Sequence, residues 1–352
     1  MTGPAGALPD FDIRINGAAL PLPVLQDVRA VTVSESVGEP AWFTVELSNW
    51  DDEKLQVSYS DGSLFAIGGD VEISLGYLDA LHPVVLGEIT SLEPVFTAAS
   101  PPTLTVGGYG YAHRLARTRR TRSFARMKDS AIAAQIGRES GLRVVATDTK
   151  VALPYVAQAN ETDWGFLRRR AARIGYEVFV RDKVLHFRAP TTAAKAQHTL
   201  RVGGDVSEFL PRLSAVGQVG GVTVHGWDVT RKQVLVGRAT PGELDLMGAT
   251  HSGPKSADGA FGTSSTASVD LAPRTPAEAA MIARGLLATG ARGFVQATAR
   301  CGGDATLRAG TVVRIDDAGT RFSGPYYVTA VTHTLSPDQG YRTTLAVERN
   351  GA

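Results

Sequence analysis

Two runs of arginine are the part of this sequence whose residue types and spacing point most directly to chemistry. Arg168, Arg169 and Arg170 are consecutive in TDWGFLRRRAARIGYEVFVRDKVLHF, residues 162–187. Residues 114–128, RLARTRRTRSFARMK, hold seven basic side chains and no acidic one. Clustered positive charge attracts acidic surfaces. A surface that binds something acidic is therefore the first hypothesis.

The stretch around Arg168–Arg170 also has a structural interpretation. Its apolar residues recur at steps of three, four and three, which is typical of a short amphipathic helix: Trp164, Leu167, Ala171 and Ile174. Thr162 or Asp163 can cap this helix, and Gly175 can end it. The arginines then lie on its solvated outer face. YEVFV and KVLHF alternate around Arg181-Asp182-Lys183, which predicts a hairpin.

The basic run at 114–128 has two main interpretations. It is a solvated linker, or it is an electrostatic patch that meets an acidic partner. Nucleic-acid binding would require interleaved aromatic side chains for stacking, and only Phe124 is present. The candidate partner-interface residues from the two runs are Arg117, Arg119, Arg120, Arg122, Arg168, Arg169 and Arg170.

Motifs of known catalytic sites are missing from the sequence. No G-x-S-x-G, H-E-x-x-H or phosphate-loop pattern occurs, and GGYGYAH at 107–113 lacks the third glycine of a dinucleotide-binding loop. The acidic clusters at 51–53 and 316–317 have the setting of turns. Cys301 lacks a thiolate-activating context, and the seven histidines are isolated from one another. We therefore predict no catalytic, cofactor-binding or metal-binding residue.

The composition is that of a globular protein with balanced charge. The 352 residues exceed one ordinary domain, and 43% are hydrophobic, enough for buried cores. A formal net charge of +1 argues against a protein dedicated to nucleic acid or anionic membranes. The segment MTGPAGALPDFDIR lacks the apolar core of a signal peptide, and no run of about 18 apolar residues predicts a membrane span. A single cysteine excludes a disulfide within the chain.

Strands are predicted at both ends of the chain. Residues 11–110 contain alternating segments such as WFTVELSN and DVEISLGY, separated by turn residues. A helix capped by Asp129 or Ser130 and the helix-hairpin unit follow, up to Pro190, and strands then return. Residues 239–274 are rich in Gly, Ser, Thr and Ala and are interpreted as a long, mobile loop. Thr275-Pro276-Ala277-Glu278 reads as a capping box that starts a helix ending near Gly290.

An internal repeat links the two strand-rich regions. At an offset of 242 residues the following positions coincide: Gly68 with Gly310, Val71 with Val313, Ile73 with Ile315, Ile89 with Val331 and Thr90 with Thr332. Leu104 and Val106 meet Leu345 and Val347 at an offset of 241. An offset of 177 residues aligns two further sets: Val45, Leu47, Trp50 and Asp51 with Val222, Val224, Trp227 and Asp228. Their collinear order predicts two copies of one β-domain. Three chains with two copies each can form a ring of six.

Three blocks resemble the phage late control D family. FDIRINGAALPLPVLQDVRAVTVSESVGEPAWFTVELSN is similar to the opening of these proteins, and AGTVVRIDDAGTRFSGPYYVTAVTHTLSPDQGYRTTLAVERN to their closing segment. ETDWGFLRRRAARIGYEVFVRDKVLHFRAP contains the family pattern D-W-x-F-L-x-x-x-A-x-x-x-G-Y. The three blocks span about residues 11–350.

This resemblance implies the central hub of a contractile phage tail or injection system, including the hub part of VgrG-like spikes. The implied protein is a structural virion or particle component: a homotrimer that joins the hexameric inner tube to the trimeric spike of the baseplate. The implied fold class is mainly β (α+β), with tube-protein-like β-barrel domains at 1–113 and 191–352 and an α+β insert at 114–190. The second barrel carries a loop-helix insertion at about 239–290.

The implied partners are inner-tube or tube-initiator proteins, a separate spike protein and other baseplate components. VgrG-type members continue into a needle, whereas this chain stops at Ala352, so the piercing tip is expected to be another chain. Neither nucleic acid, nor membrane insertion, nor a cofactor is expected, and assembly would take place in the bacterial cytoplasm. The alternatives to this non-enzymatic hub are a tail-tip module that binds host surfaces or carbohydrate, and a cell-wall hydrolase. The sequence leaves phage, tailocin and injection system open.

Overall fold

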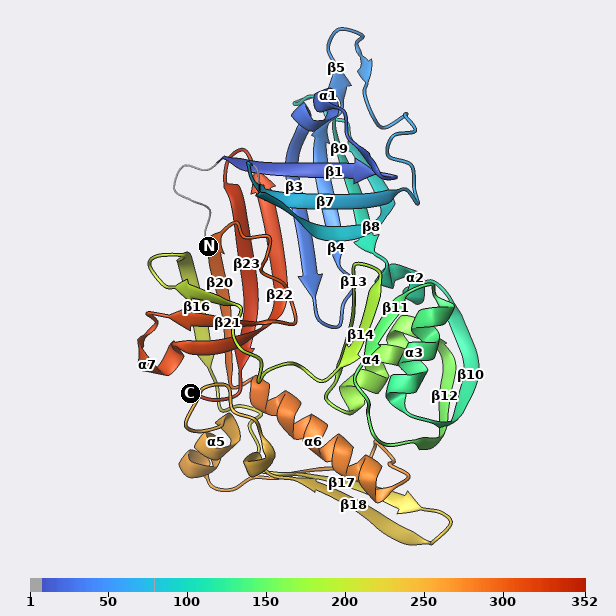
Figure 1. Ribbon diagram of the computed structural model, residues 1–352, viewed down its shortest axis with the longest axis vertical. Helices are drawn as coiled ribbons and strands as arrows, with labels where there is room; N and C mark the ends of the chain where they lie inside the picture. The colour runs from blue at the N-terminus through green and yellow to red at the C-terminus, as the bar shows by residue number, and fades with distance from the viewer. Residues whose placement is uncertain (1–7, 79) are drawn as a thin grey trace.

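One large sheet is the main feature of the structure, a computed structural model that describes residues 8–78 and 80–352 (Figure 1). This sheet has 13 strands and runs through both halves of the chain. Its strands are β1 (Pro9–Ile15), β2 (Ala18–Ala19), β3 (Val28–Ser36), β4 (Trp42–Ser48), β7 (Asp70–Tyr77), β8 (Ala80–Val95), β9 (Thr103–Gly110), β15 (His198–Arg201), β16 (Val206–Leu213), β20 (Val295–Gly302), β21 (Val312–Asp316), β22 (Gly324–Ser336) and β23 (Gly340–Arg349). The protein is therefore mainly β, as predicted.

The sheet contains the same arrangement of strands twice. In the N-terminal half the order is β3-β4-β9-β8-β7-β1, and in the C-terminal half it is β16-β20-β23-β22-β21-β15. Strands in equal places also follow one another in the same order along the chain. The halves differ in that β1 is antiparallel to β7 whereas β15 is parallel to β21. The predicted internal repeat is present in the fold.

Irregular positions recur in both halves. Gly68 and Gly310 both have positive φ, 87° and 76°, which glycine adopts without strain. Gly68 donates its N–H to the Ile89 carbonyl at 2.9 Å, and Gly310 donates to the Val328 carbonyl at 2.7 Å. A β-bulge follows directly after Ile89 in β8 and after Val328 in β22. Ile89 and Val328 are thus equivalent positions, 239 residues apart.

The strand register corrects part of the predicted repeat. The offset of 242 residues holds between β7 and β21. In β8, however, Ile89 corresponds to Val328 of β22 and not to Val331. The predicted matches are therefore three residues out of register for β8 and two for β9. The match at 177 is wrong, because β4 corresponds to β20 and the segment at 222–228 lies outside the large sheet. Alternating strands look alike at every shift of two residues, and a β-bulge moves the alternation by one residue more, so only the hydrogen bonds decide the register.

An α+β insert lies between the two halves in sequence and packs beside them (Figure 1). Its elements are α2 (Ala112–Ala116), β10 (Arg119–Met127), α3 (Asp129–Glu139), β11 (Arg143–Ala146), β12 (Leu153–Thr162), α4 (Asp163–Arg173), β13 (Glu177–Arg181) and β14 (Val184–Arg188). The predicted helix and hairpin are confirmed. The Thr162 hydroxyl accepts the Gly165 N–H at 3.1 Å. Asp182 and Lys183 have φ of 49° and 63°, as a two-residue hairpin turn requires.

The basic run at 114–128 is not a solvated linker. Most of it forms β10, which pairs with β12 as an antiparallel two-stranded ribbon. Phe124 anchors this ribbon, because its side chain is buried and stacks on Phe166 of α4 at 5.7 Å between ring centroids. The strand was missed because its outward positions carry charge instead of the β-branched residues that usually indicate a strand.

Residues 239–274 are folded, so the prediction of a long mobile loop is wrong. The segment includes η1 (Pro241–Glu243), α5 (Gly253–Phe261) and β19 (Thr266–Ser268), and β19 pairs with β17 (Val222–Asp228), which also pairs with β18 (Gln233–Ala239). The Ser252 side chain caps α5 by accepting the Lys255 N–H at 3.3 Å. The prediction failed because small residues give this segment the composition of a flexible loop.

Helix α6 (Pro276–Arg292) lies across the β17–β18 ribbon at one end of the molecule (Figure 1). Thr275 caps it as predicted, since its hydroxyl accepts the Glu278 N–H at 3.1 Å. The second half of the predicted capping box is absent: the Glu278 carboxylate accepts the Arg274 N–H at 2.8 Å and pairs with Arg173 of the insert. The remaining short elements are α1 (Leu22–Gln26), β5 (Trp50–Asp51), β6 (Gln56–Val57) and α7 (Gly319–Phe322).

Each part of the fold has an apolar core. Phe43 and Ile73 belong to the core of the N-terminal half, and Val313 and Leu345 to that of the C-terminal half. A further core joins the insert to α6, since it contains both α4 and α6 side chains. Every helix in the described ranges is too short or too polar to cross a lipid bilayer.

Candidate interaction surfaces

Arg170 lies inside the insert and not on its surface. The residue is 6% exposed, and its guanidinium donates to both Asp129 oxygens, from Nε at 2.6 Å and from Nη2 at 2.9 Å. The expectation of a solvated position is wrong for this residue. Position 170 follows the buried Phe166 by about one helical turn, so both side chains point inward. Asp129 lies 41 residues earlier, at the start of α3, and no local pattern pairs the two.

Arg168 and Arg169 do lie on the outer face of α4. Arg168 forms an ion pair with Glu39 of the N-terminal half at 2.7 Å, and Arg169 donates twice to Glu161, at 2.9 and 2.8 Å. Both arginine side chains remain about half exposed. Exposed ion pairs of this kind contribute under about 1 kcal/mol each. This face of the helix is open to solvent and to a partner.

The arginines of β10 contact groups of the insert itself. Arg122 donates to Asp163 at 2.7 Å and also pairs with Glu139. Arg120 lies 3.4 Å from the Asp163 carboxylate, and Arg119 donates to a backbone carbonyl at 2.8 Å. Asp163 is 4% exposed, so the two guanidinium groups compensate a buried charge. Much of the positive charge in this run is neutralised within the chain.

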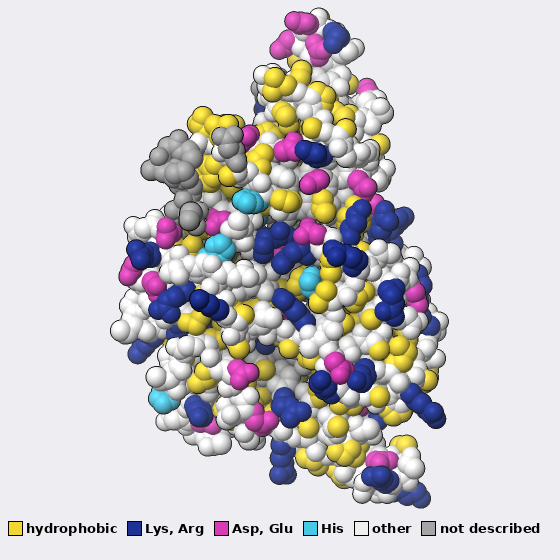
Figure 2. All heavy atoms as spheres, in the orientation of Figure 1, with side chains coloured by type: hydrophobic (Ala, Val, Ile, Leu, Met, Phe, Trp, Pro, Cys, Tyr) yellow, Lys and Arg dark blue, Asp and Glu magenta, His cyan; other side chains and the backbone are white. Residues whose placement is uncertain are grey.

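Arg117 differs from the other six candidates. In the parts of the chain that the structure describes, its exposed guanidinium forms no hydrogen bond or ion pair. On the face shown in Figure 2, Lys and Arg side chains are scattered and carboxylates lie among them. The seven arginines do not make one continuous basic patch. Burial removes Arg170 from the predicted partner surface. The other six residues stay a prediction: Arg117, Arg119, Arg120, Arg122, Arg168 and Arg169.

The two halves of the large sheet join where β22 meets β3. These strands are antiparallel from the pair Ala330–Ser36 to the pair Leu335–Val31. We call residues 31–36 and 330–335 the internal seam. The hydroxyl oxygens of Ser34 and Thr332 lie 3.1 Å apart across it. The seam makes two copies of one strand arrangement into a continuous sheet.

Glu35 connects all three parts of the fold at the internal seam. It is 7% exposed and accepts two hydrogen bonds from Arg308 of the C-terminal half, at 2.9 and 2.6 Å. Arg181 of the insert donates to its other oxygen. Burial by itself would raise the pKa of Glu35, but the two guanidinium groups outweigh burial and lower that pKa below its usual value. One ionised carboxylate therefore holds the insert and both halves together.

His333 is a buried histidine within the seam. Its Nδ1 lies 3.0 Å from the Tyr341 hydroxyl and 3.1 Å from the Thr343 hydroxyl. Burial, with a smaller effect of Arg308, lowers the pKa of the His333 imidazole from 6.5 to about 4. Glu35 and Asp304 act in the opposite direction and are outweighed. The ring is neutral at pH 7.

The free energy of unfolding is expected to fall as the pH drops from about 6.5 to about 4. In that window the unfolded chain binds a proton at His333 and the folded chain does not. The expected loss is on the order of 3 kcal/mol. Urea titrations at pH 7, 5.5 and 4.5 would measure it, and His333→Gln should flatten this part of the profile. The exposed His82, changed to Gln, serves as the control, and equal profiles for both variants would contradict the assignment.

Other buried polar groups are held in unreactive states. Burial raises the pKa of the Cys301 thiol to about 12, so the thiol is protonated at neutral pH and a poor nucleophile. Glu177 accepts from the Tyr327 hydroxyl and from Arg188, the latter at 2.9 Å. Within residues 8–78 and 80–352, no three His, Cys, Asp or Glu side chains gather as they would around a metal ion.

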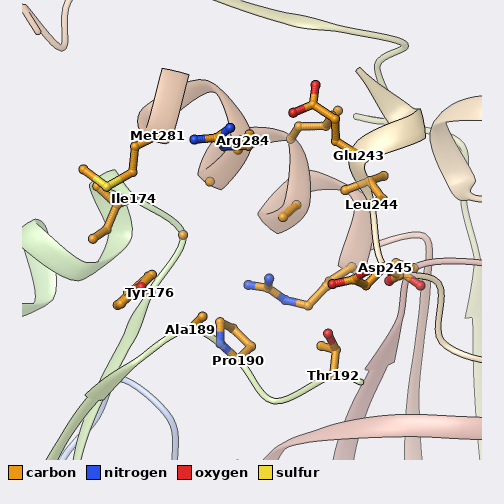
Figure 3. Close-up of a pocket in the computed structure, with 16 residues that line it drawn as sticks. Ile174, Tyr176, Ala189, Pro190, Thr192, Glu243, Leu244, Asp245, Met281 and Arg284 are labelled. Carbon is orange, nitrogen blue, oxygen red and sulfur yellow. The ribbon is translucent and has the colours of Figure 1, made fainter. Parts of the chain in front are cut away.

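A hollow of about 280 Å³ lies where the insert meets α6 (Figure 3). Tyr176 and Pro190 line it from the insert, and Arg284 lines it from α6. Gly285 lets the two parts approach, because a Cβ there would lie 2.3 Å from the Ile174 carbonyl carbon. The insert and α6 are therefore in close backbone contact beside the hollow, at Gly285 and Ile174.

The model of one protein family, described as the Alg8 N-terminal domain, matches residues 5–337. The chain belongs to this family. That description names no activity, and no curated protein matches the sequence.

Solved structures show where else this fold occurs. The prophage MuSo2 43 kDa tail protein from Shewanella oneidensis has a TM-score of 0.72 and 15% identity, over 97% of this chain and 98% of that chain. The tail protein from Neisseria meningitidis MC58 has a TM-score of 0.71 and 13% identity, over 97% and 96%. The third structure is an Escherichia coli component of the type VI secretion system, described as similar to the T4 tail proteins gp27 and gp5. It has a TM-score of 0.62 and 15% identity, over 96% of this chain and 77% of that chain. The chain has the fold of these proteins.

Proposed function

We propose that the chain is a structural hub of a contractile tail or injection system, in which three copies join a hexameric inner tube to a trimeric spike. The observation that carries this proposal is that one chain holds the same six-strand arrangement twice in one continuous sheet. Three chains would then offer six similar units to a six-fold ring. The insert occurs once per chain and would keep three-fold symmetry on the side of the spike.

The fold relatives support this proposal. They are described as tail proteins and as a type VI secretion component. Because one fold can serve several functions, the repeat and not the fold alone supports the stoichiometry. The finer assignment to the late control D family is part of the proposal. The partners are inner-tube or tube-initiator proteins, the spike and other baseplate components, and assembly takes place in the bacterial cytoplasm. The role is non-enzymatic.

The mass of the purified chain in solution tests the proposal. Light scattering on a sizing column, over a concentration series, should show a species near three times 37.2 kDa, alone or with the spike and tube proteins of the same particle. Electron-microscopy averages of that species should show a ring with six lobes. A chain that stays monomeric in every mixture overturns the hub.

A further inference from the structure

Two open sheet edges of this fold correspond to the two sides of the internal seam. Among the described residues, β16 beyond Val206 pairs only with β20, and β8 beyond Ile89 pairs only with β9. In the repeat, β16 stands in the place of β3, and β8 stands in the place of β22. Each edge therefore lacks the neighbour that its counterpart has in the seam.

Shared bulges give the correspondence residue by residue. The bulge after Val28 in β3 matches the bulge after Val206 in β16, as the bulge after Ile89 matches that after Val328. Three seam positions of β3 therefore correspond to β16 as follows: Thr32 to Leu210, Ser34 to Arg212 and Glu35 to Leu213. Three of β22 correspond to β8: Val331 to Leu92, Thr332 to Glu93 and Thr334 to Val95.

The open edges expose apolar side chains that the seam register would cover. Val95 is 49% exposed, Leu210 57% and Leu213 36%. In that register Val95 of one copy faces Leu210 of another, and Leu92 faces Leu213, as Thr334 faces Thr32 and Val331 faces Glu35 in the seam. Covering apolar surface of this kind is favourable, at roughly 25 cal/mol per Å².

The charged residues on the two open edges also fit the register of the internal seam. Glu93 and Arg212 take the places of Thr332 and Ser34, whose hydroxyl oxygens are in contact across the seam. Both side chains are exposed, and neither has a hydrogen bond or ion pair in the described parts of the chain. A carboxylate and a guanidinium opposite each other stabilise a strand pair, whereas like charges there destabilise it.

Two prolines limit what else these edges can bind. Pro94 of β8 and Pro211 of β16 occupy positions equivalent to His333 and Val33, which face each other in the seam. Proline has no N–H to donate, so it discourages pairing of an edge with arbitrary strands. Contact between the two edges would therefore rely on the flanking side chains, and it would be weaker than the internal seam.

From this correspondence we infer that the β8 edge of one copy meets the β16 edge of the next copy, in the register of the internal seam. The inference rests on the proposed hub and names the surface that closes its ring. The contact is head-to-tail, with Glu93 against Arg212 and apolar pairs on both sides of them. Each ring of three then contains three internal seams and three intermolecular ones.

Cysteine cross-linking tests this contact directly. The variant Glu93→Cys/Arg212→Cys should form disulfides between copies and give covalent species of two and three chains on a non-reducing gel, because the equivalent seam side chains touch. The native Cys301 is buried and does not interfere. The matched control is Glu93→Cys/Arg314→Cys, since Arg314 is about half exposed but lies on β21, away from both edges. It should give no such ladder.

Charge reversal provides an independent measurement. Glu93→Arg alone and Arg212→Glu alone should each raise the concentration at half assembly at least tenfold, and combining them should restore most of the loss. Assembly into trimers without the specific cross-link, or without this rescue, overturns the edge contact and leaves the hub standing. If the unmodified chain never assembles, both the hub and this contact are overturned.

Discussion

Replacing Glu35 by glutamine is expected to lower the free energy of unfolding by about 3–5 kcal/mol at pH 7. The amide keeps the size of the side chain but removes the charge that balances Arg308 and Arg181. Its NH₂ group would also point a donor at guanidinium donors in a site that is 7% exposed. Urea unfolding followed by circular dichroism would measure the loss.

Glu39→Gln is the matched control for this prediction. Glu39 also forms an ion pair, with Arg168 at 2.7 Å, but its side chain is 56% exposed. The control should therefore cost less than about 1 kcal/mol. Similar losses for the two variants would show that burial and the two guanidinium groups do not increase the contribution of Glu35 to the free energy of unfolding.

The pH dependence of the Glu35 effect has a definite sign. Because the pKa of Glu35 is lowered in the folded protein, its contribution is complete above 4.5, the value for the unfolded chain. The contribution is lost as the pH falls through the lower folded value. The difference between the native protein and Glu35→Gln should therefore shrink in acid. A difference that stays constant down to pH 3 would contradict the assignment.

Arg170→Met is expected to destabilise the insert by about 3–5 kcal/mol. Methionine fills much of the space, but it leaves the Asp129 carboxyl group, which is 1% exposed, without the guanidinium that now donates to both of its oxygens. Trp164 is buried on the same helix, so tryptophan fluorescence can report on this part of the fold during urea unfolding.

Two further variants isolate the cause of that loss. Arg169→Met removes a neighbouring arginine whose pair with Glu161 is exposed, and it should cost less than about 1 kcal/mol. Asp129→Asn combined with Arg170→Met removes both charges and should recover part of the stability. If the double variant is as unstable as Arg170→Met alone, packing and not the unpaired charge explains the effect.

Local features of this protein were determined by its sequence. The caps at Thr162 and Thr275 depend on N–H groups three residues away, and the hairpin turn depends on Asp182 and Lys183 alone. The apolar alternation of the strands predicted a mainly β chain, and the glycine pair Gly68 and Gly310 marked the repeat. Such features are readable because the interacting groups are neighbours in the sequence, or because the pattern recurs.

The tertiary structure decided which charges are buried and how the strands are placed. Arg170 looked like its neighbours in the arginine run, and only the docking of α3 gives it Asp129 as a partner. Arg308 and Glu35 are 273 residues apart, beyond the reach of any local pattern. Residues 239–274 have the composition of a flexible loop, yet they form η1, α5 and β19, and β19 pairs with the distant strand β17.

The strand register and the position of the open edges depend on the whole sheet and not on any single strand. Alternation has a period of two, so it cannot choose between offsets of 239 and 241; the hydrogen bonds at the bulges make that choice. Val33 and Pro211 occupy the same place in the repeat, but Val33 is buried in the internal seam while Pro211 lies on an open edge. Their surroundings differ because β3 and β22 of one chain pair with each other, whereas the equivalent strands β16 and β8 of the same chain do not.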